Sequence, residues 1–185
     1  MSVNSSAMTK PATPRRRFFS GVGCWGSLAV ILVSLILYAI ASVAPAMVFD
    51  KETWRGIEVL LGGWMGIFLG QFAWFANLFW GLSLLLAFFR RWFLTIGMTA
   101  LAFSIALDAF SFVGTKVPLD EAFVKTMIFQ SYHVGFYFWL ASIAAVGIGT
   151  VVVWVIERID KERIARAGRR QNQYVGAQRT DRNRI

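Results

Sequence analysis

The sequence contains little cysteine, histidine or charge. Cys24 and His133 are the single residues of their types, and only 16% of the 185 residues are charged. One cysteine excludes an intramolecular disulfide, a Cys-x-x-Cys redox pair and a multi-cysteine metal site. One histidine excludes a two-histidine haem or zinc site within a single chain. We therefore expect neither a metal nor a cofactor.

Motifs of the common small membrane enzymes are also missing. There is no Gly-x-Ser-x-Gly, no His-Glu-x-x-His and no phosphate-binding loop. An enzyme acting at the outer leaflet of a membrane would need catalytic partners for Asp108 or His133, and we identify none. We therefore do not expect an enzyme.

Apolar residues dominate the chain. They make up 57% of it, with eight Trp and seventeen Phe, which is far from the composition of a soluble domain. About 20 apolar residues in a helix cross about 30 Å of hydrocarbon. The long stretches with few charges predict an all-α integral membrane four-helix bundle over residues 21–156. Its spans are predicted at residues 22–47, 67–89, 92–113 and 130–156.

The stretch from Pro14 to Met47 has two interpretations. Arg15–Arg17 resembles the start of a twin-arginine export signal, and Ala44–Ala46 fits a small-residue cleavage site. However, the apolar core of an export signal has about 7 to 15 residues, whereas this run is longer and three further spans follow it. We therefore expect a permanent membrane helix.

The positions of lysine and arginine predict the orientation. Four lie in the N-terminal tail, two at Arg90 and Arg91, and nine from Arg158 onward, against four in the two remaining loops. Because cytoplasmic loops carry an excess of basic residues, both termini and Arg90 are expected in the cytoplasm of a bacterium. The chain would then be a multi-pass protein of the cytoplasmic (inner) membrane.

This orientation allows one crossing between Arg55 and Arg90. Residues 57–89 would measure about 50 Å as a helix, which is too long for one upright crossing. The surplus, residues 57–70, is predicted to be interfacial, re-entrant or part of a long tilted helix. The sequence leaves these three alternatives open.

Small residues at intervals of four predict surfaces for helix packing. Lipid tails are as apolar as leucine, so membrane helices associate through close backbone approach and shared polar contacts. The candidate packing residues are Gly62, Gly66 and Gly70 before the second span, and Ala141, Ala145 and Gly149 on the fourth. The partner could be in this chain or in another protein.

Polar residues at membrane depth form the candidate site. Asp108 is the one acidic residue inside a predicted span, and such residues are often functional. Heights along the helices place a polar cluster in the outer leaflet, made of Asp108, Gln71, Asn77, His133, Tyr137 and Tyr38. The cluster could lock the helices in register, Asp108 could be a proton or cation site, or Asp108 could reach the lipid head groups.

Both tails are basic. Residues 1–20 are predicted to be disordered, and residues 157–185 to be helical at first and disordered beyond Gly168. Nine basic residues next to a bilayer favour anionic lipid head groups, about 1 kcal/mol each near the surface. Nucleic acid is not expected, since aromatic residues are almost absent from the tail.

Two strings, QFAWFANLFW at Gln71–Trp80 and GFYFWLAS at Gly135–Ser142, resemble motifs of small bacterial inner-membrane proteins with four helices. The resemblance implies a topology but no activity. We expect an interaction or accessory subunit of a membrane complex, with a membrane-protein partner or a second copy of the chain. The alternative is a small oligomeric transporter or proton-linked channel component that uses Asp108.

Overall fold

The computed structural model describes residues 21–112, 114, 116–118 and 126–182. The predicted disordered tail, residues 1–20, lies outside the described residues, as does the end of the basic tail, residues 183–185.

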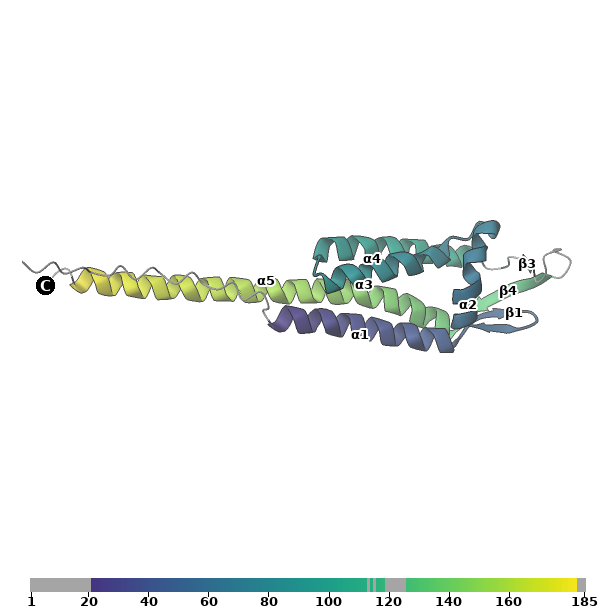
Figure 1. Ribbon diagram of the computed structural model, residues 1–185, viewed down its shortest axis with the longest axis horizontal. Coiled ribbons are helices and arrows are strands. Elements are labelled where there is room, and N and C mark those ends of the chain that lie inside the picture. The colour runs from purple at the N-terminus through teal and green to yellow at the C-terminus, as the bar shows by residue number, and fades with distance from the viewer. Residues whose placement is uncertain (1–20, 113, 115, 119–125, 183–185) are drawn as a thin grey trace, which may run out of the picture.

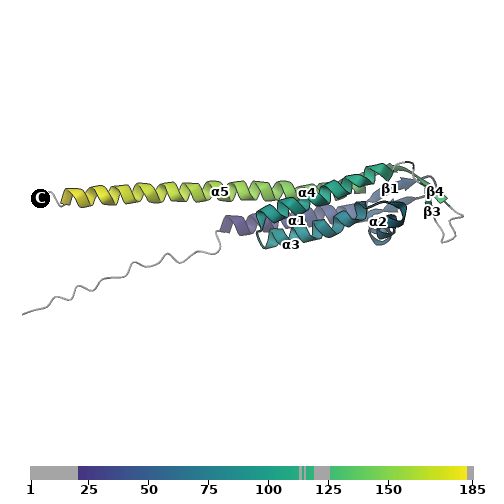
Figure 2. The same cartoon turned by 90° about the horizontal axis from the view of Figure 1, so that it is seen from above.

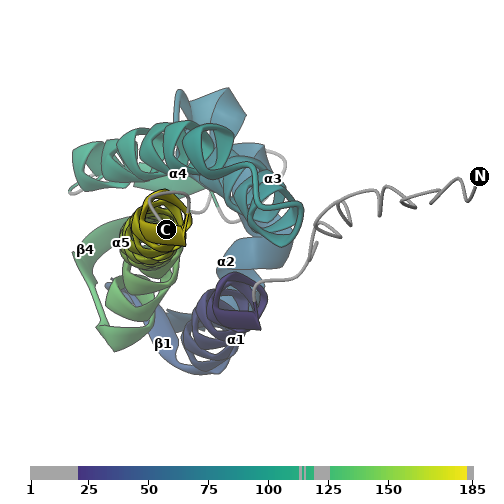
Figure 3. The ribbon, with the colours of Figure 1, turned by 90° about the vertical axis from the view of Figure 1, so that its left-hand side faces the viewer.

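The described chain is mostly helical, which confirms the prediction at that level. The main helices are α1 (Gly21–Val43), α3 (Ala76–Phe88), α4 (Trp92–Ala106) and α5 (Val134–Arg182). They pack against one another, with α1 and the first half of α5 side by side and α3 beside α4 (Figures 1 and 3). The 3₁₀-helix η3 (Leu107–Phe112) continues α4, and η2 (Ala73–Phe75) precedes α3.

Three helical segments among the described residues are long and apolar enough to cross a membrane. They are Gly23–Val43, Trp92–Phe112 and Val134–Arg169. The predicted second span, 67–89, contains a shorter apolar helix, Ala73–Phe88. The residues before it form turns and 3₁₀-helix, so the predicted span is only partly helical.

A four-stranded antiparallel sheet caps one end of the helices, which the sequence analysis did not predict. Its strands are β1 (Pro45–Phe49), β2 (Thr53–Arg55), β3 (Lys116–Pro118) and β4 (Thr126–Tyr132), in the order β2-β1-β4-β3. Phe49, Met127 and Phe129 form its small core.

The sheet shortens two predicted spans. α1 ends at Val43 rather than at residue 47, because Pro45 has no N–H to continue a helix and disfavours helical backbone before it. α5 begins at Val134 rather than at residue 130, because the preceding residues pair with β1.

Residues 56–69 lie across the long axis of the other helices. α2 (Gly56–Gly62) continues into the 3₁₀-helix η1 (Gly63–Leu69), which ends at Gly70 with a left-handed backbone, φ 72°. Figure 1 shows α2 between the helices and the sheet. The turn at Gly70 separates this segment from α3, so the two do not form one long tilted helix.

The molecule therefore has two unlike ends. The end that carries the sheet, α2 and η1 is called the sheet end below. At the Arg90 end, α3 turns into α4 at Arg90 and Arg91, next to Glu157 of α5. From Glu157, α5 extends past the other described helices to Arg182, beyond the predicted helical limit of Gly168 (Figures 1 and 2).

Small side chains allow the helices to approach closely. The largest buried cluster contains Ala76, Ala102 and Ala106 with Trp80, Ile143 and Val146. Between α1 and α5, a Cβ atom on Gly149 would lie 2.6 Å from Val30 Cγ2, and one on Gly26 would lie 2.9 Å from Val153 Cγ2. Glycine is therefore required for the observed spacing of α1 and α5.

Candidate functional site

Asn77 joins three helices at the sheet end. Its Oδ1 atom accepts hydrogen bonds from the Tyr38 hydroxyl of α1, at 3.1 Å, and from Trp139 Nε1 of α5, at 2.8 Å. Its Nδ2 atom donates to the carbonyl of Trp74, at 2.9 Å. All these groups are partly buried, where an unpaired polar group is costly. Asn77 thus fixes α1 and α5 against the start of α3.

A second chain of hydrogen bonds lies one helical turn below Asn77. Trp80 Nε1 donates to Ser34 Oγ at 3.0 Å, and the Ser34 hydroxyl donates to the carbonyl of Ser142 at 2.8 Å. The Tyr38 ring stacks on Trp80 with 4.1 Å between ring centroids. Trp80, Trp139 and Ser142 were not among the predicted site residues. The available signal was the spacing of four between Ser34 and Tyr38, which places both on one face of α1.

Asp108 and Gln71 lie in a separate group of contacts. Asp108 Oδ2 accepts a hydrogen bond from the backbone N–H of Phe72 at 2.9 Å, and the Asp108 carbonyl accepts one from Ser111 at 2.7 Å. Gln71 Nε2 donates to Ser111 Oγ at 3.2 Å. Gln71 Oε1 is buried without a hydrogen-bond partner. The group ties η3 to the turn before η2.

His133 and Tyr137 are in neither group. Both side chains are exposed, and the hydrogen bonds of His133 come from its backbone: its N–H donates to the Ala46 carbonyl at 2.9 Å, and its carbonyl accepts from the Phe136 N–H at 3.0 Å. Of the six predicted cluster residues, the structure brings together Tyr38 with Asn77, and Asp108 with the turn that contains Gln71. No hydrogen bond among the described residues joins Asp108 to His133.

The predicted packing glycines have different surroundings. A Cβ atom on Gly62 would meet no atom within 4 Å, and one on Gly66 would meet only its neighbour Gln71. Gly70 is the left-handed cap of η1. Because Gly63–Leu69 is a 3₁₀-helix, residues four apart do not share one face there. On α5, Ala141 is exposed, Ala145 is partly buried and Gly149 contacts α1.

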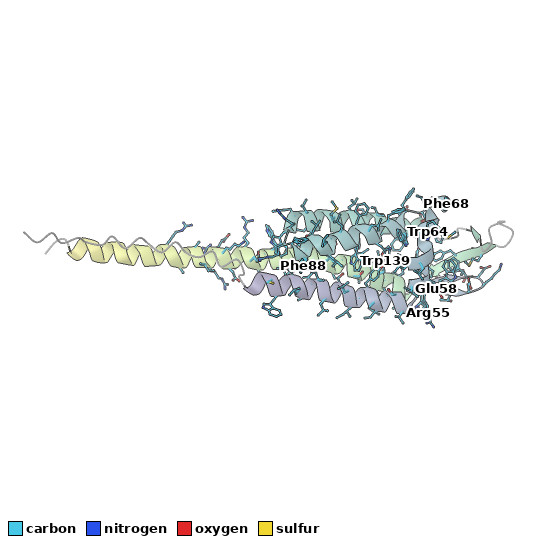
Figure 4. The ribbon with its side chains drawn as sticks, viewed as in Figure 1. Arg55, Glu58, Trp64, Phe68, Phe88 and Trp139 are labelled. Carbon is cyan, nitrogen blue, oxygen red and sulfur yellow. The ribbon has the colours of Figure 1, made fainter. Side chains whose placement is uncertain are left out.

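A cavity of about 350 Å³ lies at the sheet end, between the helices, η1 and the sheet. Its wall is mostly apolar and includes Ala41, Val59, Met65, Phe68 and Phe136. Tyr38, Asn77 and Gln71 also line it. The volume lies in the range of ligand sites, about 300 to 1,000 Å³. Figure 4 shows side chains around this end, with Trp64 and Phe68 on η1 and Trp139 on α5.

Tyr132 closes the side of the cavity next to the sheet. Its hydroxyl donates to the carbonyl of Ala109, and its ring stacks on Phe136 with 3.8 Å between centroids. Burial raises the pKa of Tyr132 above its ordinary value of 10, and the negative charge of Asp108 raises it further. The phenol therefore keeps its proton and its hydrogen bond to a higher pH than an ordinary tyrosine would.

An ion pair holds the opposite end. Arg90 of the α3–α4 turn pairs with Glu157 of α5, which is 5% exposed, and Lys161 Nζ lies 3.8 Å from Glu157 Oε2. A side chain on Gly23 of α1 would overlap both Glu157 and Arg90. In the sequence, Arg90 was interpreted only as an orientation signal. The ion pair could have been inferred because Arg90 and Glu157 each follow the end of a predicted span, and both ends were predicted on the cytoplasmic side.

The described residues hold no group of three or more His, Cys, Asp or Glu side chains that could bind a metal ion. The side chains at the sheet end instead fix helices and enclose an apolar space. No protein-family model, curated protein or solved structure matches the chain.

Proposed function

We propose that this chain is a non-catalytic interaction subunit of a complex in the bacterial cytoplasmic membrane. In this proposal α1, α3 with η2, α4 and α5 make four crossings, and both ends of the chain lie in the cytoplasm. Three long apolar helices and one shorter apolar helix support the crossings. The lysine and arginine distribution supports the orientation.

The Arg90 end is then cytoplasmic and the sheet end is outside. Arg90, Arg91 and Arg158 would lie at the level of the inner head groups. At the sheet end, α2 and η1 expose Leu61, Trp64 and Phe68, which are 71%, 50% and 77% exposed (Figure 4). A segment that lies across the helix axis and exposes such side chains fits the outer membrane interface, where aromatic residues are enriched.

The observation that carries the proposal is the free arm of α5, residues 158–182. It leaves the other helices as one continuous helix, and at 1.5 Å per residue it is about 38 Å long (Figure 1). Its described side chains, residues 158–169, are almost all exposed. Because helices in proteins gain most of their stability from packing rather than from propensity, a partner surface would stabilise this arm.

The direction and charge of the arm favour a protein partner with an acidic surface. Arg158 pairs with Glu162 at 3.8 Å, and Arg166 pairs with Glu162 at 3.6 Å, which supports the helix. Because the arm continues along the bundle axis, its distal turns lie beyond the roughly 8 Å over which salt screens head-group charge. Anionic lipid would therefore contact only the first turns, near Arg158 and Lys161.

Photo-crosslinking in cells tests the proposal. A photoreactive amino acid at Ile164, which is 74% exposed on the arm, is expected to capture one protein in a fixed ratio. Trp25 of α1 is 75% exposed and serves as the matched control, since it is expected to face lipid. Arg163→Glu with Arg166→Glu is expected to abolish the adduct. Absence of a protein adduct at Ile164, or the same adducts at Trp25, would overturn the proposal.

The transporter alternative makes a different prediction for Asp108. An ion site requires its carboxylate to bind and release a cation, so Asp108→Asn would abolish pH-dependent flux in proteoliposomes. The hydrogen bond from the Phe72 N–H to Asp108 supports instead a role in holding the turn before η2. Flux in the wild-type protein that Asp108→Asn abolishes, with the fold intact, would favour the transporter.

A further inference from the structure

We propose that the cavity at the sheet end binds one hydrocarbon chain of a membrane phospholipid. The inference rests on the membrane placement proposed above but not on a partner for the α5 arm. It follows from four properties of the cavity: its chemistry, its size, its connection to the outer surface of the molecule, and the glycines in its wall.

The cavity wall is largely apolar in its chemistry even where its residues are polar. Among the described residues that line it, Gln71 Oε1 is a buried acceptor without a partner, and one acceptor is fewer than the two to four partners that a buried water needs. Each aromatic donor that lines it gives its hydrogen to an acceptor within the protein. Tyr38 and Trp139 donate to Asn77, Trp74 to the Leu60 carbonyl at 2.8 Å, Trp54 to Glu52 at 2.8 Å, and Tyr132 to the Ala109 carbonyl. These donors are therefore not available to a polar solute, and a hydrocarbon is the ligand that loses least by entering.

Water is a poor occupant of such a space. A buried water needs two to four polar partners, and apolar cavities without them stay dry. An empty cavity of about 350 Å³ is also unfavourable, since its lining loses the packing contacts that a filled space provides. A flexible hydrocarbon chain restores these contacts without requiring hydrogen bonds.

The wall of the cavity is continuous with the surface that the proposal places against lipid. Met65 and Phe68 of η1 line the cavity, yet they are 54% and 77% exposed. A chain from the outer leaflet could thus enter sideways past η1 without crossing water. Because the cavity lies at the ends of α1, α3 and α5, a phospholipid would keep its head group at the interface while one chain enters.

Glycines keep this side of the cavity open. Gly62, Gly63 and Gly66 all line it. A Cβ atom on Gly62 would meet no heavy atom within 4 Å, whereas one on Gly63 would lie 2.7 Å from Trp74 Cδ1. A larger side chain at residue 62 therefore meets no neighbouring heavy atom at its Cβ, and because Gly62 is part of the cavity wall, leucine at this position tests whether the cavity is the binding site.

The test is native mass spectrometry of the full-length protein after exchange out of phospholipid nanodiscs, under washing that removes boundary lipid. Wild-type protein is expected to retain one phospholipid. Gly62→Leu is expected to retain at least tenfold less. Gly97→Leu on α4 is the matched control, since Gly97 is also open but does not line the cavity, and it is expected to match wild type. Retention of a free fatty acid in place of a phospholipid would still support a site for one hydrocarbon chain, but the ligand would then be a fatty acid.

A second measurement uses the wild-type protein alone, so it does not depend on the folding of Gly62→Leu. A phospholipid with a photoreactive group in its chain is expected to label Phe136 and Trp139, which line the cavity and are buried and partly buried. Trp25 and Phe93, 75% and 77% exposed on α1 and α4, report labelling from bulk lipid. Labelling confined to Trp25 and Phe93, or equal retention in Gly62→Leu and wild type, would overturn the inference.

Discussion

The two ends of the helical bundle are held together by different interactions. At the Arg90 end, Gly23 and Gly26 let α1 approach α5 closely, and the Arg90–Glu157 ion pair joins the α3–α4 turn to α5. At the sheet end, a hydrogen-bonded network around Asn77 joins the helices, and a cavity remains between them and the sheet. The Arg90 end is held by charge and by the close packing of α1 on α5, whereas the sheet end is held by hydrogen bonds around an apolar cavity.

The difference shows two solutions to one physical problem. Helices in lipid gain little from burying apolar surface, so close packing and polar contacts must hold them. Close packing at the Arg90 end leaves no room for a ligand between α1 and α5. The Asn77 network fixes the helices at a few points and leaves space between those points. Changes to the ion pair, to the close helix contacts and to the Asn77 network should therefore affect mainly stability, whereas a side chain that enters the open space of the cavity, as in Gly62→Leu, should affect mainly binding.

The largest effect is expected when Glu157 is removed. Glu157→Ala leaves Arg90 without its partner in a partly buried place, and we expect a loss of about 2 to 3 kcal/mol in unfolding free energy. This loss is smaller than that expected when one partner of a fully buried ion pair is removed, because Arg90 is 28% exposed. Reversible unfolding in mixed micelles measures it.

The control for this prediction is Glu162→Ala on the α5 arm. Glu162 is 56% exposed in its pairs with Arg158 and Arg166, and it should contribute less than about 0.5 kcal/mol. The double variant Arg90→Ala with Glu157→Ala should have a higher unfolding free energy than Glu157→Ala alone, because no unpaired Arg90 remains. Equal effects of Glu157→Ala and Glu162→Ala would contradict the proposed role of the ion pair.

A methyl group on Gly135 should destabilise the sheet end. Its Cβ atom would lie 2.8 Å from the Pro45 carbonyl oxygen and 2.9 Å from that of Ala44, and backbone atoms cannot move aside easily. We expect Gly135→Ala to lower the unfolding free energy by about 2 kcal/mol. Thermal unfolding in detergent measures it, with Gly97→Ala as the open-site control. A stability of Gly135→Ala equal to the control would show that β1 and α5 can separate.

Loss of the Asn77 side chain should have a smaller effect. Asn77→Ala leaves the Tyr38 and Trp139 donors without their acceptor. Measured hydrogen bonds between membrane helices average about 0.6 kcal/mol, so we expect a total loss of about 1 kcal/mol. In a double-mutant cycle, Tyr38→Phe should cost about half of this in the wild-type protein and almost nothing in Asn77→Ala. Additive losses would mean that the two side chains act independently.

The smallest effect is expected from Tyr132 at high pH. Because its folded pKa is raised, the unfolded chain loses this proton first, at about pH 10, and stability falls as the pH rises above that value. Below pH 10 both states keep the proton and no change is expected. Tyr132→Phe should remove this part of the alkaline loss, whereas Tyr137→Phe, at an exposed residue, should keep it. An unchanged alkaline profile in Tyr132→Phe would contradict the prediction.

The helical character of the chain could be predicted because long apolar runs dominate the sequence. The sheet could not be predicted by the same argument. An apolar strand next to an apolar helix lengthens the uncharged run, so the strand is counted as part of the membrane span. In β4, Met127 and Phe129 are buried and Ile128 is exposed, and this alternation of period two is the signal that the span prediction ignored.

The sequence predicted the level of each candidate residue along its helix but not the side of the helix to which its side chain points. Counting residues along each helix placed Tyr38 and Asn77 at similar levels, and the structure joins them by a hydrogen bond. The same counting cannot tell which way a side chain points around its helix. His133 lies in the link between β4 and α5, where its side chain is exposed, so the structure does not place it with Asp108. The cavity depends on η1 lying across the bundle, which no periodicity in the sequence predicted.

The unbroken length of α5 has a mechanical consequence. Gly135, at its first turn, lies against the carbonyl groups of Pro45 and Ala44, so a displacement of the sheet acts directly on the helix. If α5 pivots near Glu157 as a rigid lever, a tilt of about 5° moves the tip of the roughly 38 Å arm by about 3 Å. Motion on one side of the bundle would thus reach the far tip without any intermediate joint.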